Sequence, residues 1–171
     1  MWYLPDIGLL VLRLVLGLVV AAHGSQKILG WFGGQGLSGH AAFMKMMGIR
    51  PSGLFAAINA MGEFFGGLGI AAGLLTPLAA AGPIGSMSVA VISVHWRKGF
   101  WNHGGGFEYP FVLAAVSFVI GLIGPGRYSL DAALGIRFPE PWTYIIVLAA
   151  TALVVIYAVT RRVPPAPQNQ A

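Results

Sequence analysis

Five hydrophobic stretches, separated by short polar segments, run along the chain and predict five membrane-spanning helices. They cover residues 6–29, 53–75, 77–96, 109–123 and 141–159. An α-helix rises about 1.5 Å per residue, and the hydrocarbon core of a bilayer is about 30 Å thick, so most of these stretches can cross it. The pattern therefore predicts an all-α protein embedded in a membrane.

The polar segments between these stretches predict two short helices that do not cross. Residues 38–47 begin at Ser38 and carry several Met and Phe side chains, which is typical of a helix lying in the membrane interface. Ser129 is a good N-cap for a second short helix, with Asp131 in its first turn. We expect a membrane domain over residues 1–135, an additional transmembrane helix over 136–160 and a disordered cytoplasmic tail over 161–171.

The composition agrees with this class and restricts the chemistry. Hydrophobic residues make up 57% of the chain and charged residues 9%, whereas soluble domains carry about 25% charged residues. The net charge is +5, and the basic residues flank the hydrophobic stretches, so we expect contact with anionic lipid and not with nucleic acid. The chain contains no cysteine, which excludes disulfides, thiolate nucleophiles and iron–sulfur clusters within it.

The basic residues also predict an orientation, because cytoplasmic loops are enriched in Lys and Arg. Five crossings place only Arg127 and Arg137 on one side. The other side receives Lys27, Lys45, Arg50, Arg97, Lys98, Arg161 and Arg162. We therefore predict a multi-pass protein of a bacterial-type inner membrane, with its N-terminus outside and its C-terminus in the cytoplasm.

Two charged residues, Arg13 and Glu63, lie inside hydrophobic stretches. Such a charge costs at least about 2.5–3.5 kcal/mol in the centre of a bilayer, so it usually pairs or faces a cavity. Counted from the predicted helix ends, Arg13 lies about 10 Å and Glu63 about 15 Å from a membrane surface. We predict a buried ion pair between Arg13 and Glu63. It could be a structural lock or a proton or ligand site, and the alternative is that the two residues do not meet.

Further polar side chains gather at the predicted cytoplasmic ends of the helices, where they form a candidate ligand-binding site. These residues are His23, Lys27, His95, Asn102, Glu108 and Tyr109. Histidines at helix ends can ligate haem iron or hydrogen-bond a quinone carbonyl, although His, Trp and Tyr also populate the membrane interface without any ligand. For His40 and His103 the interfacial interpretation is favoured. No two histidines have helical i, i+4 spacing, and we predict no metal site.

An ordered set of short motifs extends over residues 5–135. It consists of Arg13, Gly17, His23-Gly24, Lys27, Gly30-Trp31-Phe32-Gly33-Gly34, Glu63, Gly73-Leu74-Leu75-Thr76-Pro77, His95, Gly99-Phe100-Trp101-Asn102, Gly105-Gly106-Phe107-Glu108-Tyr109-Pro110 and Gly124-Pro125-Gly126-Arg127-Tyr128-Ser129-Leu130-Asp131. Together these motifs resemble the DoxX family of membrane proteins. The resemblance implies a four-helix membrane bundle and an association with redox chemistry, since the family is similar to a thiosulfate:quinone oxidoreductase subunit. The fifth helix and the tail depart from the family pattern.

Three functions remain open from the sequence. The first is a redox-associated subunit that interacts with a quinone, or with a membrane oxidoreductase complex, with haem as the other cofactor to consider. The second is a non-catalytic accessory subunit of a larger membrane complex, which the small size and additional helix favour. The third is a small-molecule or proton transporter, motivated by Arg13, Glu63 and the kink expected at Pro83. The sequence leaves open whether the chain is itself an enzyme. Expected partners are the lipid bilayer and other membrane protein subunits.

Overall fold

The computed structural model describes residues 3–160, which are almost entirely helical and contain no strand. The predicted tail, residues 161–171, lies outside the described residues. The helices are α1 (Leu4–Ile28), η1 (Trp31–Gly33), α2 (Gly36–Met46), α3 (Ser52–Ala72), α4 (Thr76–Ala90), η2 (Val91–His95), η3 (Trp96–Lys98), η4 (Asn102–Gly104), α5 (Glu108–Ile123), α6 (Leu130–Leu134) and α7 (Trp142–Thr160). The predicted all-α fold is confirmed.

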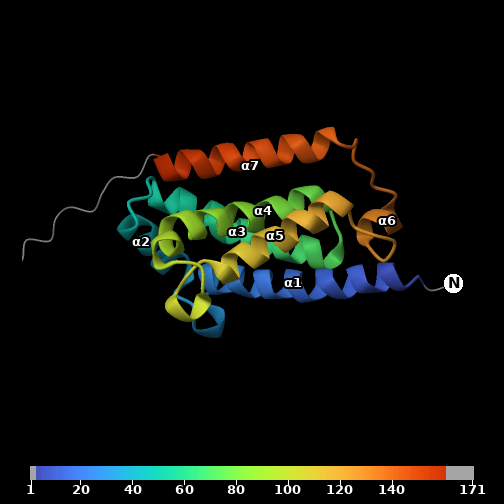
Figure 1. Cartoon of the computed structure of the whole chain (residues 1–171). Helices are drawn as coiled ribbons and strands as arrows, with labels where there is room; N and C mark the ends of the chain where they lie inside the picture. Colours follow the sequence, from blue (N-terminus) through green and yellow to red (C-terminus); the bar gives the residue numbers. More distant parts are fainter. Residues whose placement is uncertain (1–2, 161–171) are drawn as a thin grey trace, which may run out of the picture.

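Four helices form the central bundle, in which α1 packs on α3, α3 on α4, and α5 on both α4 and α1 (Figure 1). A hydrophobic core lies between them and includes Val20 of α1, Ile70 of α3, Ala80 of α4 and Ile120 of α5, all fully buried. Because each helix contributes one apolar stripe to this core, the bundle closes around it. This is the predicted four-helix arrangement.

Small residues bring α1 and α3 into close contact and fix their register. A Cβ atom at Gly17 or Gly67 would overlap the backbone of the facing helix, and one at Gly24 would overlap Phe64. Small residues at such contacts allow membrane helices to approach closely. The register that results places the last turn of α1 beside the middle of α3, which decides which polar residues can meet.

Helix α4 begins at a sharp turn after α3 and changes its winding at its other end. It continues through Pro83, whose ring packs where Gly66 of α3 leaves room, and then opens into the π-helical segment η2. Single π-helical turns are frequent at functional sites. Here the wide turn ends at His95, at the same end of the bundle as α2.

The other helices cover the ends and one side of the bundle. Helix α2 packs on α3, while α6 is capped by the hydroxyl of Ser129, which accepts from the amide of Ala132 at 3.1 Å as predicted. Helix α7 lies outside the bundle against α4 (Figure 1). The close contact at Gly85 and Thr151, and the hydrogen bond that Tyr144 donates to the carbonyl of Phe118 at 2.5 Å, hold α7 there.

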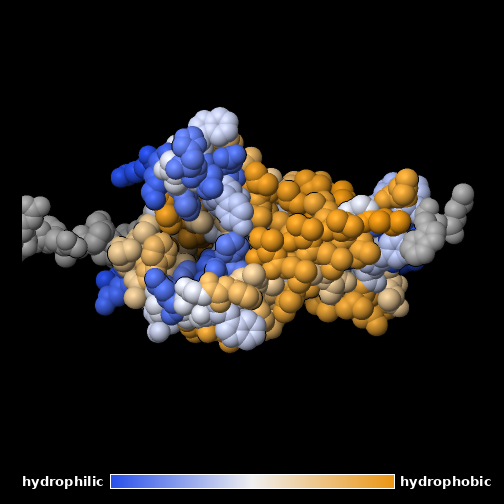
Figure 2. Space-filling view, turned by 90° about the horizontal axis from the view of Figure 1, so that it is seen from below, coloured by the Kyte–Doolittle hydropathy of each residue, from blue (hydrophilic) through white to orange (hydrophobic). Residues whose placement is uncertain are grey.

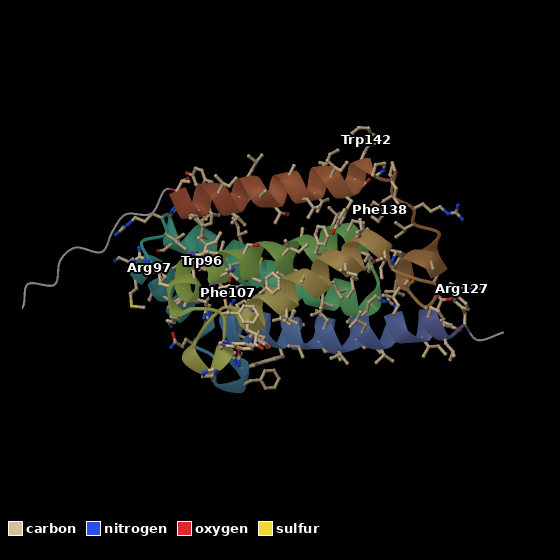
Figure 3. The ribbon with its side chains drawn as sticks, viewed as in Figure 1. Trp96, Arg97, Phe107, Arg127, Phe138 and Trp142 are labelled. Carbon is tan, nitrogen blue, oxygen red and sulfur yellow. The ribbon has the colours of Figure 1, made fainter. Side chains whose placement is uncertain are left out.

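The surface has the pattern of a membrane protein. In the described part of the chain, four helical segments are long and apolar enough to cross a bilayer: Leu4–Ile28, Ser52–Ala72, Thr76–Lys98 and Trp142–Thr160. Helix α5 is apolar but has only 16 residues. Figure 2 shows apolar residues over the middle of one face and polar residues gathered at its ends. Trp96 and Arg97 lie at one end of the bundle, and Arg127 and Trp142 at the other (Figure 3).

Candidate functional site

The last turn of α1 and the middle of α3 bring together a buried ion pair. The Nζ atom of Lys27 lies 2.5 Å from Oε1 of Glu63. The Glu63 side chain is 0% exposed, whereas that of Lys27 is 26% exposed. Lys27 therefore connects a fully buried carboxylate with the more open end of the bundle.

A chain of hydrogen bonds extends this pair to two further helices, α2 and α4. Lys27 also donates to Oδ1 of Asn59 at 2.9 Å, and the ring of His40 in α2 donates to the same oxygen from Nε2 at 2.9 Å. The amide of Asn59 donates to the Ser86 hydroxyl in α4 at 2.7 Å, and this hydroxyl donates to Glu63. We call these five residues, Lys27, His40, Asn59, Glu63 and Ser86, the polar network.

The polar network retains unused hydrogen-bonding capacity. Oε2 of Glu63 is buried and has no hydrogen-bond partner among the described residues. An ammonium group has three N–H groups, and the contacts of Lys27 with Glu63 and Asn59 leave one for a further acceptor. Buried polar atoms are rarely left unpaired, so the free oxygen of Glu63 distinguishes this pair from an ordinary structural ion pair.

The environment of His40 favours the neutral form of its ring. Burial, and after it the positive charge of Lys27, lowers the pKa of His40 from its ordinary value, and these effects outweigh the hydrogen bond to Asn59 and the charge of Glu63. A neutral imidazole has one N–H and one acceptor nitrogen. Since Nε2 donates to Asn59, Nδ1 is the acceptor.

Beside the polar network lies a cavity of about 190 Å³, which we call the polar cavity. Its polar lining residues include four from different elements: Lys27, His40, Ser86 and His95. Met and Val side chains from α2 and α4 complete the wall. Several hydrogen-bonding groups thus converge on a space that is otherwise apolar, which is typical of a small-molecule site.

A second cavity, of about 280 Å³, adjoins the first and lies between α3, α4 and α7. We call it the apolar cavity, because most of its lining residues are apolar. Helix α7 contributes Ala150, Thr151, Val154, Val155 and Ala158. The two cavities share five lining residues, namely Met44, Ile49, Asn59, Ser86 and Val89. A polar and an apolar cavity thus lie side by side against a common wall.

The remaining residues of the predicted ligand-binding site are divided between local contacts. Nε2 of His23 accepts from the Tyr109 hydroxyl at 2.8 Å, and Nδ1 donates to Gln26 at 3.2 Å. Both ring nitrogens of His23 are thus engaged, which does not fit axial ligation of haem by His23 and His95. Figure 3 shows Trp96 and Phe107 beside each other in this region, where their rings stack 5.3 Å apart.

Three other predicted residues hold the loop between η2 and α5. Nδ1 of His95 donates to the carbonyl of Gly105 at 2.7 Å, which leaves Nε2 as an acceptor when the ring is neutral. The Glu108 carboxylate accepts from the backbone amide of Asn102 at 2.9 Å. Of the six predicted residues, only Lys27 and His95 line the polar cavity.

The predicted ion pair between Arg13 and Glu63 is wrong. Arg13 is buried near the opposite end of α1, where its guanidinium lies against Gly73, donates to the carbonyl of Tyr128 and interacts electrostatically with Asp131. In the α1–α3 register, Gly24 faces Phe64, so Glu63 lies level with the last turn of α1 and not with Arg13. Asp131 itself accepts hydrogen bonds from Leu75 and Thr76 at the start of α4, so Arg13 belongs to a structural junction.

Comparison with known families now adds to this geometry. The family model DoxX matches residues 8–96, more than half of the chain. The chain belongs to the DoxX family. No curated protein and no solved structure matches it. All five residues of the polar network lie inside the DoxX segment, whereas α5, α6 and α7 follow it.

Sequence reasoning missed the partner of Glu63 and the part played by His40 and Ser86. The small residues of the two helices do indicate the partner of Glu63. Gly17, Ala21 and Gly24 form a stripe on α1 that matches Gly67 and Ala71 on α3. Aligning these stripes as antiparallel helices sets Lys27 beside Glu63. His40 gave no such signal, because its contact depends on how α2 folds back on α3.

Proposed function

We propose that this DoxX protein binds a quinone in the joined cavities and serves as the quinone-binding subunit of a membrane oxidoreductase. The observation that carries the proposal is the shared wall between the polar and the apolar cavity. A quinone has a polar ring with two carbonyl oxygens and a long apolar tail. A site with one polar and one apolar end, reached from inside a bilayer, suits that shape.

The polar cavity offers the hydrogen bonds that the ring needs. Lys27 has one N–H for a carbonyl oxygen, and His95 has an acceptor nitrogen for the hydroxyl of the reduced form. The Glu63 carboxylate compensates the charge of Lys27, so the cavity can hold a neutral molecule without a net buried charge. These groups orient the ring and exclude bulk water from it.

The apolar cavity provides the place for the first part of the tail. Its lining includes Val154 and Val155 of α7 and the small residues Gly82 and Gly85 of α4. Burying one apolar group of the size of a Leu side chain contributes about 1.5–3 kcal/mol. Helix α7, which follows the DoxX segment, thereby becomes part of the binding site.

A bound quinone would supply two-electron chemistry, with the electrons provided by a partner subunit. The chain has no cysteine to hold an iron–sulfur cluster or to act as a redox thiol. As part of the proposal, the end of the bundle that carries α2 and Arg97 faces the cytoplasm of a bacterial-type inner membrane, in agreement with the basic residues gathered there. The partner would dock at that end or along α7.

The proposal is tested by titrating the purified protein with decylubiquinone in detergent and mapping a photoreactive quinone by mass spectrometry. We expect saturable binding and crosslinks on α3, α4 and α7. Ala150→Phe fills the apolar cavity and should weaken binding about 10- to 100-fold, because the buried tail contributes about 1.5–3 kcal/mol.

The matched control is Ala149→Phe, at the neighbouring exposed position of α7 that does not line the apolar cavity. This variant should bind as the unchanged protein does. Equal weakening by both substitutions would contradict the assigned site. The absence of any saturable quinone binding would sink the proposal and leave a non-catalytic accessory subunit as the better interpretation.

A further inference from the structure

A third, smaller cavity lies on the outer side of the polar network, under the loop that follows α1. Its volume is about 160 Å³, well above the roughly 10–15 Å³ that one water needs. We call it the vestibule. The loop that covers the vestibule folds back closely on Gln26. Only a glycine fits at position 34, because a Cβ atom there would overlap the Gln26 backbone.

The vestibule and the polar cavity share three side chains in their linings. These are Lys27, His40 and Phe43. Gln26 and Gln35 make the outer part of the vestibule polar, so water is its natural content. The inner side of the same wall is the site proposed above for a quinone ring.

Lys27 is the side chain placed to carry protons across this wall. It is the one lysine or arginine among the described lining residues of the polar cavity. The ammonium of Lys27 contacts Glu63 and Asn59, both in α3. The other titratable groups that face the cavity are His40 of α2 and His95 of η2. Glu63 is fully buried and does not line the vestibule, so it has no direct contact with water there.

We propose that Lys27 is the proton donor to a molecule bound in the polar cavity and that the vestibule is the water-filled route that recharges it. This inference rests on the proposed quinone site. A quinone accepts two electrons and two protons to become a quinol. Each of the two ring oxygens receives one of these protons. For the oxygen beside Lys27, one N–H bond of the ammonium breaks, an O–H bond forms, and the resulting neutral amine takes a proton from water in the vestibule. The other oxygen takes its proton from water.

The water route can be tested without any ligand, because the chain contains no cysteine. Single cysteines are introduced at Phe43, which lines the vestibule and the polar cavity, and at Val154, which lines the apolar cavity. A charged, membrane-impermeant methanethiosulfonate reagent reacts with thiolates, which form only where water reaches. Phe43→Cys should react about as fast as Gln35→Cys in the vestibule, and Val154→Cys about a hundredfold more slowly.

Equally slow labelling of Phe43→Cys and Val154→Cys would overturn the route, whatever binds in the cavities. The same labelling also separates the two proposals. If decylubiquinone does not bind but Phe43→Cys is labelled rapidly, the proposed function fails and the water route stands.

The donor role is tested with Lys27→Arg, which keeps the positive charge but gives up a proton far less readily than Lys. Decylubiquinone binding should persist, while stopped-flow reduction of the bound quinone by dithionite should slow about tenfold or more. Lys45→Arg, on the exposed side of α2, is the control and should not change the rate.

In Lys27→Ala, methylammonium should restore the rate of reduction, because it carries a transferable proton through the vestibule. Tetramethylammonium, which has the charge but no such proton, should not. Unchanged rates in both Lys27 variants, or equal rescue by the two cations, would overturn the donor role.

Discussion

The ion pair of Lys27 and Glu63 predicts an asymmetric response to removal of its two partners. Lys27→Met leaves the Glu63 carboxylate in a place where it is 0% exposed, with Ser86 as its remaining hydrogen-bond donor. Glu63→Gln leaves an ammonium that is 26% exposed and still donates to Asn59. The buried anion is the more costly residue to isolate, because Lys27 can still reach water.

The magnitudes follow from burial. Removing one partner of a buried pair costs about 3–5 kcal/mol, and we expect Lys27→Met to lower the free energy of unfolding by about that amount at pH 8. Glu63→Gln keeps the shape of the side chain and an acceptor oxygen, so the expected loss is that of one charged hydrogen bond, about 1.5–3 kcal/mol. The double variant should be more stable than Lys27→Met alone, because it contains no isolated charge.

The assay is reversible unfolding in mixed detergent micelles for the four proteins of this mutant cycle, with Lys45→Met as an exposed-lysine control. The reasoning would be refuted if Lys27→Met cost no more than Lys45→Met, or if the cycle showed no coupling.

Two further predictions concern other buried groups. Burial lowers the pKa of His40, so the unfolded chain binds a proton more readily than the folded one, and stability should fall as the pH drops below about 6.5. Between about pH 7.5 and 5.5, the unfolding temperature should fall less in His40→Gln than in the unchanged protein. An identical fall in both proteins would contradict this prediction. Gly73→Ala should cost at least about 1–2 kcal/mol, since Gly73 has φ +63° and its missing Cβ makes room for the Arg13 guanidinium. The control is Gly8→Ala in α1, where no atom lies within 4 Å of the added Cβ. It should be neutral or stabilising by up to about 1 kcal/mol in the same unfolding assay. Equal losses of stability in both variants would argue against the packing of Arg13 on Gly73.

The helices could be predicted from the sequence because their signals are local. Apolar length identified the membrane-spanning helices, and Ser129 identified the start of α6, whose hydroxyl accepts from Ala132. The ends of the helices were also close to those observed, since glycine and proline mark them. The π-helical turn η2 was not predicted, because no residue type in Val91–His95 requires it.

The pairing of charges could not be predicted in the same way, because it depends on how far one helix is displaced along its neighbour. The predicted depths of Arg13 and Glu63 were counted from the helix ends, which assumes that α1 and α3 begin and end at the same levels in the membrane. The glycine contacts instead shift the helices, so that α1 extends beyond the end of α3 towards α6. A displacement of a few residues, at about 1.5 Å each, is enough to exchange one partner for another.

Because of this displacement, the two cations of α1, Arg13 and Lys27, lie in different surroundings. Arg13 lies against Gly73 and beside Asp131, whose carboxylate oxygens are taken up by the start of α4, so the charge at that end fixes the turn between α3 and α4. Lys27, at the other end, is held by Glu63 but lines both the vestibule and the polar cavity. A buried charge that only stabilises a fold is best enclosed, whereas one that exchanges protons needs contact with water on one side and with a ligand on the other. Of these two cations, Lys27 is the one that lines two cavities, so we look for ligand chemistry at its end of the bundle and for structural effects at the end of Arg13.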